Sequence, residues 1–437
     1  MEPVCLARQT AKGRNPFMSL DTLSDKLKIV SRQLLVFSKW IACSGILGVT
    51  VGGVATLFHY SIDYATGFRE AHGWILWLLP AAGVAIALLY KLCGMENDRG
   101  TNLVLMSIRS TEKISILMAP LIFFSTVVTH FCGGSAGREG GAMQIGGSVG
   151  AALGRLLRMD DKDERIMIMC GMSAAFSALF GTPVAAAVFS MEVISVGIMH
   201  YAAIIPCVLS AAIGYGLAGA CGVVPERYVL AGIPRLSAPA LGRVVLLAAL
   251  CAIVSTVFCL LIQSAGRLYR RYLTNTMVRA AVGGALVIAL TFLFGSRDYN
   301  GAGMGIIADA LGGNAYPAAF ALKILLTAVT LGAGFKGGEI VPAFFVGATF
   351  GSTMGGMLGL HPSFAAGIGV VALFCGVTNC PLTSILISVE LFGADGLLMF
   401  AVTSAVSYML SGYTGLYSEQ KIMYSKFRPE FIDKKVG

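Results

Sequence analysis

Charged residues are scarce in this sequence: Asp, Glu, Lys and Arg make up 13% of its 437 residues. A soluble domain carries about 25%. Hydrophobic residues reach 56% and the mean hydropathy is +0.78. A helix needs about 20 apolar residues to cross a bilayer, and the clearest candidates are residues 34–58, 74–93, 201–221, 241–266, 280–295 and 396–412. The composition therefore excludes a soluble protein and predicts a polytopic one embedded in the lipid bilayer.

Clusters of metal-binding or nucleophilic residues are also missing. The five histidines are dispersed, and the eleven cysteines form no CxxC pair. This pattern argues against a zinc site or a disulfide framework, and it favours cysteines that simply pack among apolar groups. We therefore expect no cofactor, no metal and no enzymatic activity. A membrane enzyme or a structural scaffold is the alternative from another class, and no residue pattern supports it.

The net charge of +9 is distributed in a way that excludes nucleic-acid binding, which needs a basic face. Lys and Arg gather instead in the N-terminal 40 residues, in "RLYRRYLTNTMVR" (267–279) and in the C-terminal tail. Positively charged loops mark the cytoplasmic side of a membrane protein. Both termini are therefore expected inside the cell.

The chain divides into four expected regions. Residues 1–40 form a cytoplasmic segment in which 19–35 is an amphipathic helix along the membrane surface, with Asp21 as a plausible N-cap. Two membrane repeats follow at 41–222 and 223–412. Residues 413–437 are expected to hold a last short helix and a cytoplasmic tail.

Two pairs of matching segments predict the repeat. "PVAAAVFSMEV" (183–193) matches "PLTSILISVEL" (381–391), and "GREGGAMQIG" (137–146) matches "GEIVPAFFVG" (338–347). The offsets are nearly equal, which indicates a duplicated unit of about 200 residues. Glycine-rich breaks interrupt both halves, and such breaks are costly in lipid unless they line a cavity. Paired interruptions are typical of a transporter binding site.

Glu139 is expected in the first turn of a helix, directly after glycines. Free N–H groups and the helix dipole attract an anion there. One interpretation is a capping carboxylate paired with Arg138. The other is a functional group, since ionisable residues at membrane depth usually mark ion or proton pathways. An ionised carboxylate occupies an anion site and a protonated one leaves it, which would couple anion and proton movement.

The second half holds further candidates. Glu339 lies one position before the counterpart of Glu139, and it either pairs with Lys336 or lies near the anion route. Phe344 belongs to a core or lipid-facing pair of rings, although a ring edge can contact an anion. Glu192 and Glu390 end the repeated Pro–Glu segments and are expected to pair with backbone or arginine.

Two loops add donors. Thr101 and Asn102 open a loop-then-helix segment after Gly100, and they are either ordinary N-caps or anion donors. Tyr417 follows the last apolar stretch. It is a membrane-interface anchor unless its phenol turns inward.

These motifs together resemble the CLC chloride channel and transporter family: GREG followed by QIGGSVG, a GxxxPxxxxG segment about 200 residues later, and a Pro–Glu helix after each. The resemblance covers roughly residues 40–425. It implies an all-α fold of two inverted repeats with about eighteen tilted or discontinuous helices, and a homodimer. By this resemblance Glu139 is the gating glutamate and Tyr417 the central anion ligand.

Departures from the chloride-selective pattern resemble the fluoride/proton antiporter branch of that family. The GSGIP serine loop reads "RGTNLV", GREGP reads "GREGG", GxFxP reads "GEIVP", and the inner proton glutamate is replaced by Val193. The residue that Glu339 matches is functional in that branch. By this resemblance Glu339 would tune coupling or selectivity. The anion site implied by the resemblance comprises Gly100, Thr101, Asn102, Gly137, Arg138, Gly140, Gly338, Ile340, Val341 and Phe344.

The resemblance implies a secondary antiporter in the inner membrane of a prokaryote. It would export fluoride in exchange for protons and confer fluoride resistance. A chloride/proton exchanger or a passive chloride channel of the same fold is the alternative.

Overall fold

A computed structural model describes residues 23–96, 98–110 and 112–436. The chain falls into two compact units, residues 1–42 and 43–437. The expected N-cap Asp21 lies outside the described residues. The first helix, α1 (Leu23–Ala71), is unbroken. The part of the expected amphipathic helix over 19–35 that the structure describes is helical, but it continues into the first span, because residues 23–44 contain no glycine or proline.

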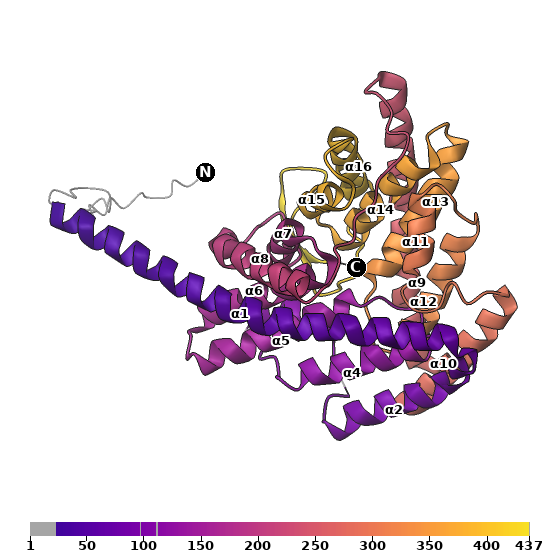
Figure 1. The fold of residues 1–437 in the computed structure, drawn as a ribbon, viewed down its shortest axis with the longest axis horizontal. Coiled ribbons are helices and arrows are strands. Elements are labelled where there is room, and N and C mark those ends of the chain that lie inside the picture. Colours follow the sequence, from indigo (N-terminus) through magenta and orange to yellow (C-terminus); the bar gives the residue numbers. More distant parts are fainter. Residues whose placement is uncertain (1–22, 97, 111, 437) are drawn as a thin grey trace, which may run out of the picture. The chain divides into compact units, whose positions relative to one another are not determined.

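The described residues are mostly helical, as predicted, with sixteen α-helices (Figure 1). After α1, the first half contains α2 (Leu79–Leu92), α3 (Thr101–Arg109), α4 (Met118–Phe131), α5 (Glu139–Leu156), α6 (Asp161–Phe180), α7 (Pro183–Glu192) and α8 (Ile204–Ala220). The second half contains α9 (Ala238–Tyr272), α10 (Thr276–Phe294), α11 (Met304–Leu311), α12 (Ala319–Gly332), α13 (Ile340–Met357), α14 (Pro362–Thr378), α15 (Pro381–Phe392) and α16 (Leu397–Leu410). Short 3₁₀ helices cover Gly73–Leu78 and Tyr201–Ala203.

Local sequence signals explain where many helices begin. Helices α7, α14 and α15 start on proline, which suits the first helical position because it has no N–H to satisfy. The side chains of Asp160, Ser237 and Asn275 accept hydrogen bonds from the first turns of α6, α9 and α10. These caps satisfy backbone groups that lipid could not.

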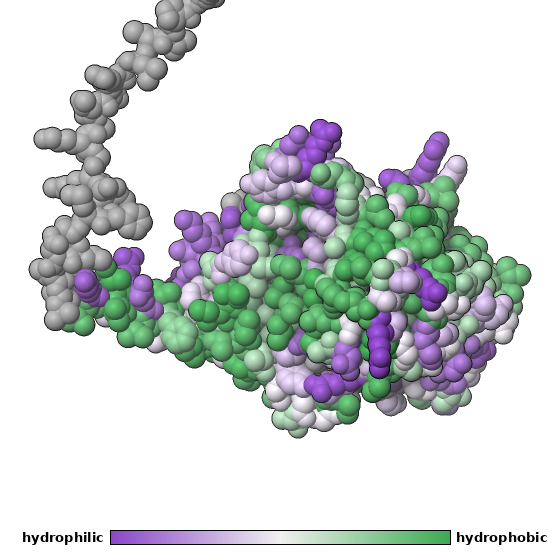
Figure 2. Space-filling model, turned by 90° about the horizontal axis from the view of Figure 1, so that it is seen from above, coloured by the Kyte–Doolittle hydropathy of each residue, from purple (hydrophilic) through white to green (hydrophobic). Residues whose placement is uncertain are grey.

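Six segments among the described residues are long and apolar enough to cross a membrane: 26–71, 73–92, 201–220, 238–272, 276–294 and 340–357. The first five correspond to predicted stretches. The predicted span at 396–412 forms the shorter helix α16, and α13 is the sixth segment. Hydrophobic residues occupy the middle of the face shown in Figure 2, with hydrophilic residues towards its borders.

The two halves repeat one helical pattern. Helices α5 and α13 both contain 18 residues and begin 201 positions apart. Each packs closely on the next helix: a Cβ on Gly146 would lie 2.2 Å from the Gly171 carbonyl oxygen, and one on Gly347 would lie 2.4 Å from that of Gly369. Glycine at both positions lets the helix backbones approach. The expected boundary at 222/223 falls between α8 and α9.

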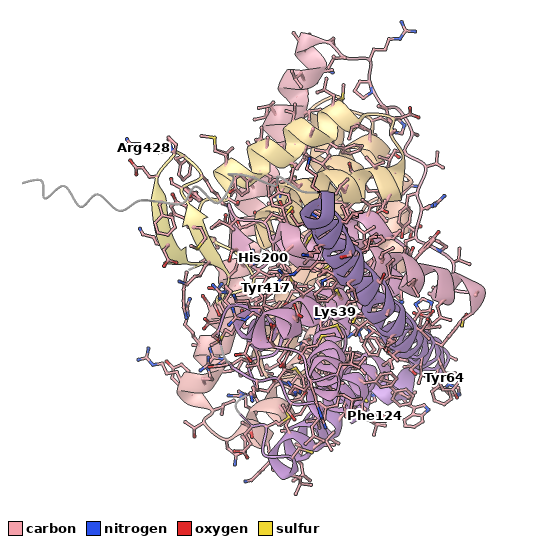
Figure 3. The ribbon with its side chains drawn as sticks, turned by 90° about the vertical axis from the view of Figure 1, so that its left-hand side faces the viewer. Lys39, Tyr64, Phe124, His200, Tyr417 and Arg428 are labelled. Carbon is pink, nitrogen blue, oxygen red and sulfur yellow. The ribbon has the colours of Figure 1, made fainter. Side chains whose placement is uncertain are left out.

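The predicted short helix after residue 412 is wrong. The segment instead contains β2 (Lys421–Tyr424) and β3 (Phe431–Lys435), which form an antiparallel pair, and β2 also pairs in parallel with β1 (Ser195–Val196). The buried Gln420 side chain ties this sheet to the membrane helices by donating to the carbonyl oxygens of Val193 and Thr378. Figure 3 shows Arg428 at the tip of the hairpin and Tyr417 in the interior.

Candidate functional site

The glycine-rich breaks of the two halves meet inside the protein. Gly137 and Gly338 form an antiparallel bridge in which each N–H donates to the other's carbonyl oxygen at 2.7 Å. Helix α5 begins two residues after Gly137, and α13 begins two residues after Gly338. Two helix N-termini from opposite halves therefore lie next to each other, and their free N–H groups create a place that favours an anion.

The Glu139 side chain occupies this place. It is fully buried, its Oε2 accepts a hydrogen bond from the Arg138 N–H at 2.7 Å, and its Oε1 accepts one from the Val341 N–H at 2.9 Å. One carboxylate thus bridges the two helix N-termini. The predicted helix start at Glu139 is confirmed, and the hydrogen-bond donors come from both halves.

Glycine is required on both sides of this carboxylate by simple contact. A Cβ added to either Gly137 or Gly338 would lie 2.3 Å from Glu139 Oε1. Gly140 is less tightly confined, since its Cβ would lie 3.0 Å from the Gly338 Cα. These three predicted site glycines allow the backbone to approach the carboxylate closely.

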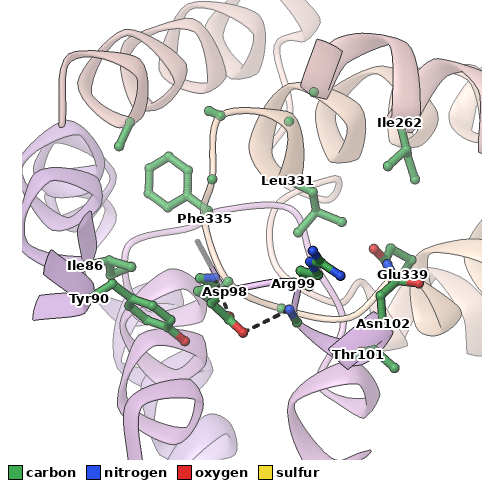
Figure 4. A pocket seen from close by; sticks show the side chains of 18 of the residues that line it. Ile86, Tyr90, Asp98, Arg99, Thr101, Asn102, Ile262, Leu331, Phe335 and Glu339 are labelled. Atoms are coloured by element: carbon green, nitrogen blue, oxygen red, sulfur yellow. Dashed lines mark hydrogen bonds and ion pairs between the residues drawn. The ribbon is translucent and has the colours of Figure 1, made fainter. Parts of the chain in front are cut away.

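A cavity of about 360 Å³, the first vestibule, opens on one side of this site (Figure 4). Figure 4 shows Thr101, Asn102 and Glu339 together at one end of it and Tyr90 at the other. Gly100 and Tyr417 also line it, as do the basic residues Arg99, Arg270, Arg279 and Lys336. Four predicted anion ligands, Gly100, Thr101, Asn102 and Tyr417, therefore meet around one cavity. Its wall holds four basic side chains and three acidic ones, and the excess of positive charge draws anions towards it.

Thr101 and Asn102 differ in what they contact. Thr101 Oγ1 accepts a hydrogen bond from Gln144 Nε2 at 3.3 Å, beside the first turn of α5. Asn102 Oδ1 accepts from the Glu419 N–H at 3.1 Å, so it holds the turn that follows Tyr417. Tyr417 is 2% exposed, and its hydroxyl lies 4.0 Å from Met143 Sδ. The phenol therefore turns inward, and the interface-anchor alternative is wrong.

Lys336 and Glu339 do not form the ion pair considered from sequence. Lys336 Nζ lies 2.9 Å from Asp98 Oδ2 and 4.1 Å from the centre of the Tyr90 ring. Asp98 precedes Lys336 by more than 200 residues, so only the tertiary fold brings them together. Glu339 is the N-cap of α13 and lines the first vestibule.

A second cavity of about 600 Å³, the second vestibule, has Arg138 in its wall. Its lining includes Asp63, Arg69, Arg138, Arg297 and Asp298. The described residues that line the two vestibules do not include Glu139. The bridging carboxylate lies between residues of the two walls, because its neighbour Arg138 lines one cavity and Glu339, across the paired glycines, lines the other.

Phe344 is the predicted site residue that the fold places elsewhere. Its ring lies edge-on to Phe180 at 6.3 Å and tilted against Phe374 at 5.6 Å, and it lines a small apolar cavity instead of either vestibule. The core interpretation holds for this ring. Ile340 and Val341 are buried at the start of α13, where Val341 contributes its N–H.

Glu192 and Glu390 bind backbone, as predicted. Glu192 accepts hydrogen bonds from the N–H groups of Leu382 and Thr383 at 3.0 and 2.8 Å, and Glu390 accepts from those of Val184 and Ala185 at 2.9 and 2.8 Å. Each carboxylate thus caps the N-terminus of the matching helix in the other half.

Sequence reasoning missed several residues around the site. His59 and Asp63 contact Arg138 from α1, and Gln144 contacts Thr101. The fully buried Lys323 Nζ donates to the carbonyl oxygens of Tyr299 and Gly301 at 3.0 and 2.7 Å. The sequence did carry a signal for His59 and Asp63, since polar residues four positions apart in an apolar helix share one face. No group of metal-binding side chains is found among the described residues.

A buried carboxylate between two opposed helix N-termini, with a vestibule on either side, is an arrangement that can admit an anion when the carboxylate leaves. The fold and this site define a multi-pass membrane protein built for anion passage. Residues 82–412 match the voltage gated chloride channel family. The chain belongs to that family, which confirms the resemblance to CLC proteins.

Several relatives place the chain within the family. It is 37% identical over 396 residues to the chloride/fluoride channel protein of Pseudomonas syringae pv. tomato, covering 89% of this chain and 88% of that one. It is 25% identical to the H(+)/Cl(-) exchange transporter ClcA of Vibrio parahaemolyticus, covering 83% and 84%. Its fold matches the crystal structure of a CLC-type fluoride/proton antiporter with a TM-score of 0.85 and 29% identity, covering 88% and 98%. A slow cyanobacterial Cl-/H+ antiporter shares the fold at a TM-score of 0.71 and 19% identity.

Proposed function

We propose that this protein is a secondary antiporter that exports fluoride in exchange for protons. The observation that carries the proposal is the position of Glu139, whose carboxylate holds the amides of Arg138 and Val341 and lies between residues of the two vestibule walls. An ionised carboxylate competes with an anion for these amides. A proton abolishes that competition, because a neutral acid is a weaker acceptor at a site that favours negative charge.

The exchange follows from this competition. An anion gathers in the basic first vestibule and approaches past Thr101 and Tyr417. A proton that arrives on Glu139 frees its carboxyl from the amides, and the anion takes the place it leaves. When Glu139 loses the proton, it returns to the amides and displaces the anion. The proton and the anion therefore use the same site in alternation, which is the basis of exchange.

Fluoride is the anion that the sequence and the relatives support. Fluoride holds its water strongly, so a site must replace that water with several donors, and the Arg138 and Val341 amides lie close enough together to act jointly. The GEIVP motif, which departs from the GxFxP pattern of the chloride-selective members, places Glu339 in the vestibule wall. The related Pseudomonas protein is a chloride/fluoride channel protein, and the matching structure is of a fluoride/proton antiporter.

Other parts of the proposal concern the cell. The basic first vestibule opens to the cytoplasm, together with both termini, in the inner membrane of a prokaryote. The protein works as a homodimer, and its export of fluoride confers fluoride resistance. The positive charges of the N-terminal 40 residues and of the C-terminal tail support this orientation.

Anion efflux from proteoliposomes tests the proposal. Vesicles that contain the purified protein are loaded with fluoride or chloride. Anion efflux is followed with ion-selective electrodes while the external pH is recorded. We expect fluoride efflux to exceed chloride efflux and to drive protons inward. Chloride efflux equal to or faster than fluoride efflux would instead identify a chloride exchanger, and efflux without proton movement would identify a channel.

A further inference from the structure

The Arg138 side chain is held by three groups, of which Asp63 lines the second vestibule. Its Nη1 lies 2.9 Å from His59 Nδ1 and 3.3 Å from Asp63 Oδ1, and its Nη2 lies 3.6 Å from Glu226 Oε1. His59 and Asp63 belong to α1, whereas Glu226 lies in the loop after α8. The Arg138 side chain is 5% exposed and that of Asp63 is 52% exposed. The cluster therefore joins a buried arginine to groups that vestibule water reaches.

The contacts fix the protonation state of His59. A guanidinium has only donors, so His59 Nδ1 must accept the hydrogen bond from Arg138 and carry no proton. The other ring nitrogen, Nε2, lies 3.1 Å from Asp63 Oδ2 and donates its proton to that carboxylate. The arrangement requires a neutral imidazole with its proton on Nε2. A second proton would have to bind at Nδ1, where Arg138 now donates.

Several titratable or charged groups surround the imidazole. Asp63 lies on its own helix, Arg138 comes from the N-terminus of α5, and Glu226 comes from the loop after α8, where the Tyr228 hydroxyl donates to it at 2.8 Å. The Tyr60 ring is edge-on to His59 at 5.4 Å. Two carboxylates and one guanidinium therefore face His59.

We propose that His59 is a positioning residue for transport: in its neutral form it holds Arg138 and thereby the Glu139 gate, and when it takes a proton from the second vestibule it releases them. Protonation turns the acceptor Nδ1 into a donor and sets two cations against each other, so the Arg138–His59 contact breaks. Asp63 and Glu226 then remain as partners of the arginine.

The connection from Arg138 to the gate is direct. The Arg138 N–H donates to Glu139 Oε2 at 2.7 Å, and Arg138 is the N-cap of α5. Its side chain anchors that backbone to α1 and to the loop after α8. When one anchor is lost, the N-terminus of α5 gains freedom and the Glu139 carboxylate is held less firmly. Acid on the second-vestibule side therefore favours gate opening through His59, in addition to protonating Glu139. The inference rests on the proposed function.

The test compares fluoride efflux from proteoliposomes at equal internal and external pH, at about pH 7.5 and about pH 5.5, the range in which histidine titrates. His59→Gln keeps both hydrogen bonds, since its carbonyl accepts from Arg138 and its amide donates to Asp63, but it cannot take a proton. The matched control is His72→Gln, because His72 is an exposed histidine at the end of the same segment whose Nδ1 contacts only the Phe68 carbonyl.

We expect the acid-to-neutral rate ratio of the wild type to exceed that of His59→Gln by roughly tenfold or more, the factor that one hydrogen bond to a charged group controls. His72→Gln should keep the wild-type ratio. His59→Ala, which frees Arg138 at every pH, should be fast at neutral pH. Equal ratios for wild type and His59→Gln would overturn the inference.

A second measurement does not depend on transport. Amide hydrogen exchange of residues 137–141 is followed in detergent at both pH values and corrected for the chemical exchange rate. Protection should fall with acid in the wild type and not in His59→Gln. If protection in the wild type does not change with pH, His59 does not have the role proposed. If protection falls with acid only in the wild type but no fluoride flux is observed, only the proposed function is contradicted.

Discussion

Helices α5 and α13 begin in the same way, yet they place their carboxylates differently. Both contain 18 residues, and both start two positions after one of the paired glycines. In the first half the carboxylate is on the first helical residue, Glu139, and it bridges the two N-termini. In the second half it is on the N-cap, Glu339, and it lines the first vestibule.

The difference is one position along the chain. The structural counterpart of Glu139 is Ile340, and that of Glu339 is Arg138. Because the repeats meet in antiparallel orientation, the two N-cap side chains face opposite cavities: Arg138 lines the second vestibule and Glu339 the first. The same backbone arrangement therefore has two uses. A carboxylate on the first helical residue, as in Glu139, bridges the two N-termini, and one on the N-cap, as in Glu339, lines a vestibule.

The largest expected effect separates these two carboxylates. Glu139→Gln should abolish proton pumping driven by a fluoride gradient, because the carboxyl that bridges the two helix N-termini can then no longer take up or release a proton. Glu339→Gln should slow fluoride transport or change its preference over chloride and leave proton coupling in place. External pH and fluoride electrodes measure both. Glu430→Gln, an exposed hairpin position, is the control. Surviving proton movement in Glu139→Gln would assign the proton to another residue.

The paired glycines test whether the two halves contribute equally to the gate. Gly137→Ala and Gly338→Ala each place a Cβ 2.3 Å from Glu139 Oε1, so both should displace the carboxylate and reduce coupled fluoride transport. The loss should be somewhat larger at Gly338, whose added Cβ would also lie 2.6 Å from the Gly140 backbone nitrogen. Overpacking of this kind costs about 1–3 kcal/mol. Gly242→Ala in α9, where the added Cβ meets nothing within 4 Å, should transport normally. A strong effect at only one of the two glycines would contradict the symmetric contact.

The reciprocal caps at α7 and α15 give a smaller, unequal effect on stability. Glu192 accepts a third hydrogen bond, from the Thr383 hydroxyl at 2.6 Å, whereas Glu390 has only its two backbone donors. Glu192→Ala should lower the free energy of unfolding by about 1–3 kcal/mol, and Glu390→Ala by less. Thermal unfolding of the purified variants measures this. Equal losses would mean that the third hydrogen bond adds nothing.

The smallest expected effect concerns Lys426, which contacts the residue that ends α14 but has no counterpart, among the described residues, at the end of the matching helix α6. Helix α6 ends at Gly181 with a φ of 69°, and α14 ends at Asn379 with a φ of 59°, where the Asn379 side chain contacts Lys426 from the C-terminal segment. Burial lowers the pKa of Lys426 from its usual 10.5 to about 8. The folded state binds this proton less firmly than the unfolded state does, so the destabilisation is full below pH 8 and disappears as pH rises towards 10.5.

Lys426→Met removes that dependence. Relative to the wild type, its melting temperature should be higher at about pH 7 than at about pH 9.5, by a few degrees at most for a chain of this size. Lys434→Met, at an exposed position of β3, should follow the wild type at both pH values. A difference that does not change with pH would show that Lys426 acts through its hydrogen bonds alone.

Local signals explain which features could be predicted. The starts of α3, α5 and α13 follow from glycines and polar N-terminal residues in consecutive positions, and the repeat follows from two matching offsets. The Lys336–Glu339 pair was wrong because Lys336 has a better partner, Asp98, at 2.9 Å from a distant loop. Phe344 could not be placed because nothing in its neighbours distinguishes an anion-facing ring from one packed on Phe180 and Phe374.

The sequence by itself determined the membrane class, the helical repeat and the glycine-flanked position of Glu139, since hydropathy, helix caps and periodicity depend on residues close together in the chain. Only the tertiary structure decided that Glu139 takes one donor from each half, that Arg138 is anchored to His59, Asp63 and Glu226, and that the C-terminal segment forms strands on β1. These features join residues far apart in sequence, and a chain pattern carries no information on which distant donor lies nearest in space.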